Sequence, residues 1–169
     1  MKKGHAVMSI SVITLAGLLT VGPWVYGQTQ MVSVLTSQDA HEINQLYATM
    51  YQGSDFRDAD LWLSTFADDG VFIFPTGDEV AGKQALAEWR EKSFGGQTGD
   101  SNRRHYFPNI RMIRTPGGGA TAQAYWVELD VSGQQATIKN TGTADDVFVK
   151  TSAGWKFKSH AVHLDATTN

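Results

Sequence analysis

The stretch Arg103-Arg104-His105-Tyr106-Phe107-Pro108-Asn109-Ile110 decides the fold, because it separates helical sequence from strand sequence. Before it, apolar residues recur at spacings of three and four, which is typical of amphipathic helices. After it, alternating apolar residues and glycine-rich turns indicate antiparallel strands. His105 lies near the start of the first of these long strands. We therefore expect the helices to wrap a pocket whose floor is the sheet, with His105 facing into it.

Three helices are expected before this stretch. The first begins at Ser37, which we interpret as its N-cap, and runs through Gly53 with apolar residues on one face. The second covers residues 58–66 and is capped by Asp58. The third covers residues 82–94 and ends at a glycine-rich loop. Each helix carries apolar side chains at helical spacing, so each is expected to pack against the sheet.

Strand signals occupy most of the remaining chain. A short apolar run at residues 71–74 predicts a first strand between the second and third helices. Four longer strands are then expected over residues 103–114, 120–131, 135–150 and 155–164, with hairpin turns at glycine-rich segments between them. Sequential strands joined by such turns pair antiparallel. The sequence thus predicts an α+β fold in one domain, with the helices first and the strands mainly after them.

The N-terminal segment differs in character from the rest. Lys2 and Lys3 precede an apolar run over residues 6–25 that contains Pro23, which is typical of a secretory signal. An uncleaved membrane anchor is the alternative interpretation, because about 20 apolar residues can span a bilayer. We expect cleavage after Gly27, a secreted or periplasmic protein, and no stable membrane insertion afterwards. The parts are then a signal peptide (1–27), a short linker (28–36), one domain (37–166) and a tail (167–169).

Charge and composition exclude several classes of function. The net charge of −3 disfavours nucleic acid and anionic membranes as partners. Without cysteine, the chain has neither a lipoprotein anchor nor a disulfide framework. No set of His, Asp and Glu residues has the spacing of a metal site, and no phosphate-binding loop or nucleophile motif is present. We therefore expect neither a metal nor another cofactor.

Several short motifs, in this order and spacing, resemble a known family. The chain is similar to the SnoaL-like branch of the NTF2-like superfamily over residues 36–166, with scytalone-dehydratase-like and polyketide-cyclase-like members. This resemblance implies a cone of three N-terminal helices packed on a curved mixed, mostly antiparallel sheet. It rests on Leu46-Tyr47-Ala48, Asp55 with Asp58 and Trp62, Thr65 to Phe72, Gly82, Arg104-His105 with Asn109, Asp146 to Lys150, and Gly154 to Phe157.

The resemblance also implies catalytic positions. Scytalone-dehydratase-like members use an aspartate near the end of the first helix, histidines on the sheet, and tyrosines that hold a water against a substrate carbonyl. Asp55 and His105 stand where that aspartate and the first histidine would be. The second histidine, expected on the strand from residue 120, has no counterpart, and Glu128 and Asp130 are the ionisable residues near its place. A ketosteroid-isomerase-like base is missing too, because Phe74 occupies its position.

Asp55 and His105 are therefore the leading catalytic candidates, together with Tyr47 and Tyr51. These tyrosines and Asp55 follow one another at spacings of four and lie on one helical stripe. Asp55 would orient His105, His105 would move a proton, and Tyr47 or Tyr51 would donate a hydrogen bond to an oxygen that gains charge. The alternative is structural: tyrosines in the core, Asp55 in a helix-terminal turn, and His105 bonded to a backbone carbonyl.

Two functions of different classes remain open. The first is a cofactor-independent lyase or isomerase acting on a small, apolar, oxygenated molecule. The second is a secreted, non-catalytic module that binds such a ligand or dimerises, and a homodimer through the sheet is expected in either case. His160 and His163 differ by three along one strand, so at most one of them reaches the pocket. The expected substrate-binding residues are Trp62, Phe74, Asn109, Trp126 and Glu128.

Overall fold

The computed structural model describes residues 34–165. The expected signal peptide, most of the linker and the tail lie outside the described residues. Three helices and seven strands make up the described part, and none of these helices is long and apolar enough to cross a membrane. The elements are α1 (Ser37–Asp55), α2 (Ala59–Leu63), β1 (Phe66–Ile73), β2 (Glu79–Ala81), α3 (Lys83–Phe94), β3 (Arg103–Tyr106), β4 (Ile110–Arg114), β5 (Ala120–Asp130), β6 (Thr137–Thr151) and β7 (Gly154–Leu164).

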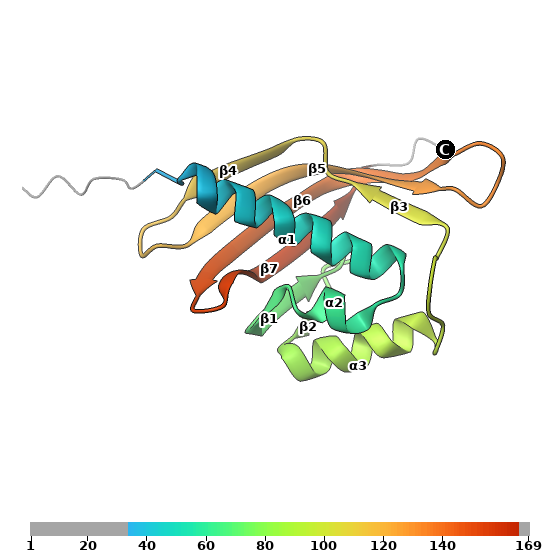
Figure 1. Ribbon diagram of the computed structural model, residues 1–169, viewed down its shortest axis with the longest axis horizontal. Helices are drawn as coiled ribbons and strands as arrows, with labels where there is room; N and C mark the ends of the chain where they lie inside the picture. The colour runs from blue at the N-terminus through green and yellow to red at the C-terminus, as the bar shows by residue number, and fades with distance from the viewer. Residues whose placement is uncertain (1–33, 166–169) are drawn as a thin grey trace, which may run out of the picture. The chain divides into compact units, whose positions relative to one another are not determined.

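The strands form one open, mixed sheet. Its order is β2-β1-β7-β6-β5-β3, and β4 also pairs with β5 beside the segment that β3 covers. Every pair is antiparallel except β1 with β7, which is parallel. The helices pack on one face of this sheet (Figure 1). The expected α+β fold with a mostly antiparallel sheet is confirmed, while β2 was not anticipated because three residues are too few to show a recognisable strand pattern.

The long helix α1 contacts both β3 and β7. Its N-cap is Thr36 rather than the expected Ser37, and Asp39 completes a capping box with it. The inner face of the sheet below α1 is lined by small side chains on β5 and β6, namely Ala120, Ala122, Ala124 and Ala144. These alanines leave room for large residues of α1, including Ile43, Tyr47 and Met50, in the core.

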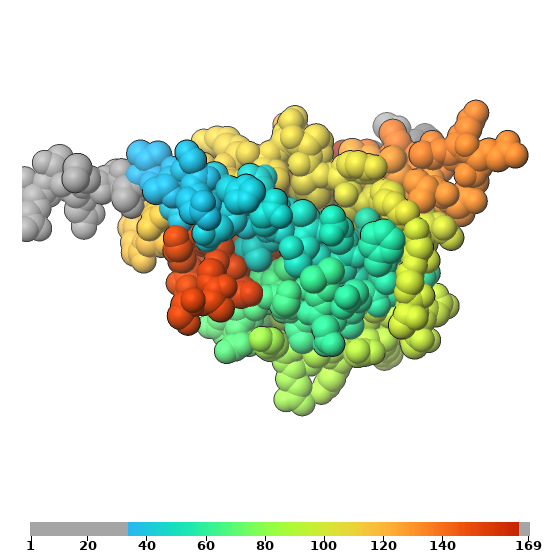
Figure 2. All heavy atoms as spheres, in the orientation of Figure 1, coloured from blue at the N-terminus to red at the C-terminus, as the bar shows by residue number. Residues whose placement is uncertain are grey.

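The shorter helices α2 and α3 pack together, and α3 also contacts β1. Asp58 caps α2 as expected, but the helix ends at Leu63 and Phe66 begins β1 instead. The expected turn around Gly70 is part of β1, where the pairing with β7 is irregular between Phe66 and Val71. Figure 2 shows α1 and α2 covering one face of the molecule, with the β5–β6 hairpin (orange) projecting beyond them.

The strand expected over residues 103–114 is broken in two. Residues 107–109 interrupt the regular pairing with β5 between β3 and β4, where Pro108 has no N–H to donate and the Phe107 ring turns inward. There the Phe107 ring centroid lies 4.4 Å from that of Tyr51 and 5.1 Å from that of Tyr47. The break therefore adds an aromatic ring to the core under α1 and leaves His105 at the middle of a short strand.

A second irregularity decides which side of β7 faces the core. Outward from the β6–β7 turn, Phe148 pairs with Phe157, but Val147 then pairs with Ser159 because Lys158 is an extra residue. Phe157 and His160 consequently share the inner face, and His160 pairs with Asp146. Without this bulge the alternation would point Ser159 inward and His160 outward.

Candidate functional site

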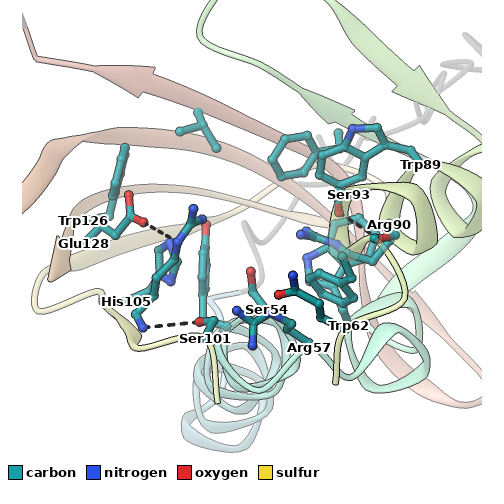
Figure 3. A pocket seen from close by; sticks show the side chains of 17 residues that line it. Ser54, Arg57, Trp62, Trp89, Arg90, Ser93, Ser101, His105, Trp126 and Glu128 are labelled. Atoms are coloured by element: carbon teal, nitrogen blue, oxygen red, sulfur yellow. Dashed lines mark hydrogen bonds and ion pairs between the residues drawn. The ribbon is translucent and has the colours of Figure 1, made fainter. Parts of the chain in front are cut away.

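A cavity of about 570 Å³ opens between the helices and the sheet. Its walls come from the three helices and from β1, β3, β5 and β7, and they combine aromatic rings with a few polar groups. In Figure 3, Trp62, Trp89 and Arg90 lie on one side, while His105 and Trp126 lie on the other. This combination of apolar walls and few converging polar side chains is typical of small-molecule sites.

Asp55 holds His105, which lines this cavity. Asp55 is the last residue of α1, and its Oδ1 lies 2.5 Å from His105 Nδ1. Its Oδ2 accepts the backbone N–H of His105 at 3.0 Å, so one carboxylate holds both the ring and the main chain of β3. A carboxylate only accepts hydrogen bonds, which places the proton on Nδ1. Nε2 is then the free acceptor of the ring, with no hydrogen-bond partner among the described residues.

A second aspartate–histidine pair lies behind the cavity and was missed in the sequence. His160 Nδ1 is 2.5 Å from Asp146 Oδ1, and both side chains are fully buried. The Tyr47 hydroxyl donates to Asp146 Oδ2, and the Tyr51 hydroxyl lies 2.7 Å from His160 Nε2. Because Asp146 accepts from Nδ1, Nε2 of the neutral ring is the acceptor and Tyr51 donates to it. A protonated His160 would instead donate to Tyr51 and free the phenol proton for a ligand.

Tyr51 links the two pairs. Its ring lies 4.8 Å from that of His105, centroid to centroid, and it lines the cavity. Burial, reinforced by the nearby Asp146 charge, raises the pKa of Tyr51 well above its ordinary value. The pKa of Tyr47 is raised as well, mainly by burial and then by Asp146. Both phenols therefore stay protonated at neutral pH and can act as donors but not as bases.

The other residues expected at the site divide into two groups. Trp62, Trp126 and Glu128 line the cavity. Phe74 does not, because its ring packs against Phe72 and Trp89, 5.0 and 5.2 Å away between centroids.

Two further expectations are corrected by the positions of the side chains. Asn109 is exposed, since it lies in the break between β3 and β4 and away from the cavity. Tyr47 lies behind the cavity wall, with its hydroxyl committed to Asp146. Of the two tyrosines only Tyr51 lines the cavity, so the expected donor role is open to Tyr51, in the state where a protonated His160 leaves the Tyr51 proton free.

The profile of the SnoaL-like domain family matches residues 36–161. This chain belongs to the SnoaL-like domain family. The match begins at the N-cap of α1 and ends within β7, so it includes both aspartate–histidine pairs. No curated protein sequence matches this SnoaL-like domain.

Solved structures share the fold of this SnoaL-like domain. A protein of unknown function with a cystatin-like fold from Nostoc punctiforme aligns with a TM-score of 0.67 and 22% identity, covering 80% of this chain and 97% of that one. Aln2 from a Streptomyces species aligns with a TM-score of 0.67 and 20% identity, and the alignment covers 79% of this chain and 95% of that one. A Catenulispora acidiphila protein in complex with S-DNPA aligns with a TM-score of 0.65 and 22% identity, and the alignment covers 77% of this chain and 96% of that one. At these identities the likeness concerns the fold.

Two residues of the site in this SnoaL-like domain were not identified from the sequence. His160 was recognised as one of two candidates on its strand, but its partner Asp146 was not, because a bulge sets their register. Arg90 follows Leu86 by four residues and so shares the apolar face of α3, a signal that was available in the sequence, but its role at the cavity was not recognised. Among residues 34–165, no group of three or more His, Asp or Glu side chains is placed to hold a metal ion.

Proposed function

We propose that this SnoaL-like domain is a cofactor-independent lyase or isomerase that moves a proton on a small, largely apolar, oxygenated molecule. One observation carries the proposal: His105 Nδ1 lies 2.5 Å from Asp55 Oδ1 at the wall of a cavity. In its neutral form, a histidine held in this way carries its proton on Nδ1 and presents Nε2 as an acceptor to a ligand, which is the arrangement that general-base catalysis requires. The buried carboxylate also stabilises the imidazolium that forms when Nε2 takes a proton.

In the proposed reaction, His105 removes a proton from a carbon next to a ligand carbonyl. Negative charge develops on the carbonyl oxygen. When a protonated His160 donates to the Tyr51 oxygen, the Tyr51 phenol proton is free and is the donor that stabilises this charge. In a dehydration, the C–H and C–OH bonds break, a C=C bond forms, and the proton on His105 leaves with the hydroxyl group as water. In an isomerisation, His105 returns the proton to another carbon. Neither route needs a group beyond the side chains of this chain.

Proton exchange tests this proposal without the natural substrate. We would incubate the protein in D₂O with cyclohexanone and 2-tetralone, and follow loss of the α-proton signals by NMR. We expect acceleration over buffer with at least one ketone, and a loss of roughly 10²-fold or more in His105→Asn and in Asp55→Asn. Because the second substitution removes only the group that orients His105, it separates general-base catalysis from simple ligand binding.

His163→Asn is the matched control, since His163 lies on the same sheet with its side chain 51% exposed. This variant should exchange protons at the wild-type rate. If the His105→Asn protein, folded as judged by circular dichroism, still exchanges protons like the wild type, His105 is not the base. If the wild type accelerates neither ketone, the alternative of a non-catalytic ligand-binding module is favoured.

A further inference from the structure

Arg90 is a buried cation without a counter-charge among the described residues. It projects from α3 toward the cavity, and only 7% of the residue is exposed (Figure 3). Within residues 34–165, its Nε has no hydrogen-bond partner. In the part of the chain that the structure describes, no carboxylate lies within ion-pair distance of its guanidinium. Buried charges in proteins are ordinarily paired, so this side chain calls for a partner.

Aromatic rings hold the guanidinium in place. Its central carbon lies 3.9 Å from the ring centroid of Trp62, 4.4 Å from that of Trp89 and 5.2 Å from that of Phe94. Such cation–π contacts attract the charge through the ring faces. The rings supply no strong hydrogen-bond acceptor, so the terminal N–H groups of the guanidinium remain available to a molecule in the cavity.

The carboxylates of Glu128 and Asp55 are already paired with other side chains. Glu128 lies 3.3 Å from Arg103 Nε, and Asp55 is held by His105. Burial lowers the pKa of Arg90 to about 9, which still leaves the guanidinium charged at neutral pH. A charged group kept away from water with no counter-charge is unfavourable. An anionic ligand would supply that counter-charge, whereas a neutral ligand would bury the cation further.

We propose that the cavity binds an aromatic carboxylate, whose carboxylate group accepts hydrogen bonds from Arg90 while its ring lies between the aromatic walls. A guanidinium matches a carboxylate by two parallel hydrogen bonds. Arg90 and His105 lie on opposite sides of the cavity, so a molecule anchored at Arg90 extends toward the proposed base (Figure 3). The inference deepens the proposed function by naming its substrate class, and its link to turnover rests on that function.

Equilibrium binding tests the proposal separately from catalysis. The probes are 2-naphthoate and its neutral analogue 2-naphthamide, and the signal is tryptophan fluorescence, because Trp62, Trp89 and Trp126 line the cavity. We expect the wild type at pH 7 to bind 2-naphthoate roughly 10- to 100-fold more tightly than 2-naphthamide, as a charge-assisted hydrogen bond predicts. Arg90→Met should remove this preference. Lys92→Met, an exposed cation on the same helix α3, is the control and should keep it.

Each outcome decides the proposal. Equal affinities for the two probes in the wild type, no 2-naphthoate binding at millimolar concentration, or an unchanged preference in Arg90→Met would overturn it. If Arg90→Met does not fold, Arg90→Lys replaces it, and its preference should fall several-fold because an ammonium cannot bind a carboxylate with the planar guanidinium geometry. If the wild type prefers 2-naphthoate but does not accelerate proton exchange of the ketones, the anion site is supported and the catalytic proposal is rejected. If it accelerates exchange but shows no preference for 2-naphthoate, the catalytic proposal is supported and the anion site is rejected.

Discussion

Two tyrosines one helical turn apart have different tasks at the level of single residues. Tyr51 faces the cavity beside His105, whereas Tyr47 donates to Asp146 behind the wall. The difference arises from the drift of a four-residue spacing around α1, which turns each successive side chain slightly away from the one before it. Identical side chains on one stripe can therefore contribute to chemistry in one case and to stability in the other.

Replacing each tyrosine by phenylalanine should separate these tasks. Tyr51→Phe removes the donor at the cavity, and we expect proton exchange to fall by roughly 10²-fold. Tyr47→Phe leaves Asp146 with one hydrogen bond fewer, so we expect the free energy of unfolding to fall by about 1–3 kcal/mol and exchange by less than about tenfold. NMR exchange rates and urea unfolding of both variants measure these effects. Equal losses of exchange in the two variants would contradict the assignment.

At the level of elements, Asp39 fastens the start of α1 to the sheet. Its Oδ1 accepts hydrogen bonds from Lys150 Nζ at 2.6 Å and from Trp155 Nε1 at 3.0 Å, and its Oδ2 lies 3.1 Å from Arg114. These partners come from β4, β6 and β7. The hydrogen bond from Lys150, with those from Trp155 and Thr36, holds the pKa of Asp39 well below its usual range despite burial.

Asp39→Asn should lower the free energy of unfolding by about 2–4 kcal/mol at pH 7, because Lys150 and Arg114 lose a buried counter-charge. A carboxyl group whose folded pKa is lowered stabilises the fold above its unfolded pKa of about 3.9, and this stability is lost as the pH falls toward the folded pKa. The difference from the wild type should therefore shrink by about 1 kcal/mol at pH 3. Urea unfolding at both pH values measures it.

Glu42→Gln is the control for this measurement, since Glu42 lies on the same helix and outside the contacts that Asp39 makes with the sheet. It should change the free energy of unfolding by less than about 0.5 kcal/mol at either pH. If the effect of Asp39→Asn were the same at pH 7 and pH 3, the charge of Asp39 would not be what fastens α1 to the sheet.

For the whole molecule, the outer face of the sheet is the main unexplained surface. Tyr106, Ile113, Tyr125 and Val147 are large apolar residues on this face, and each is between 41% and 59% exposed. Arg111 and Asp145 flank them on the same face, two strands apart. A surface that carries apolar groups together with both signs of charge can be complementary to a second copy of itself around a two-fold axis.

We therefore expect a homodimer through this outer face. Sedimentation equilibrium at micromolar concentration should give twice the mass of the chain, and Tyr125→Lys with Val147→Lys should give a monomer, because two buried lysines would lack partners. Leu61→Lys on α2 is the control, since Leu61 is also exposed but lies away from the sheet's outer face. A monomeric wild type would contradict the expectation.

The sequence by itself determined the class of fold, the three helices and the strands β5, β6 and β7, because periodicity and turn residues are local signals. Resemblance to a family paired Asp55 with His105, and the structure brings them into contact. Only the tertiary structure decided that His160 points inward. Counting residues from the β6–β7 turn would pair His160 with Asp145. The extra residue Lys158 shifts the register by one, so that His160 pairs with Asp146 instead.

The surroundings of Arg90 likewise depend on tertiary packing. Its four-residue spacing from Leu86 places it on the apolar face of α3. What it faces there depends on where α3 meets α2 and the sheet, and that packing is set by residues far away in the sequence. Local sequence can therefore predict which elements form and which residue types could do chemistry. The cavity, and the groups that share it, exist only once distant segments have packed, because burial and register are properties of the assembled sheet and helices.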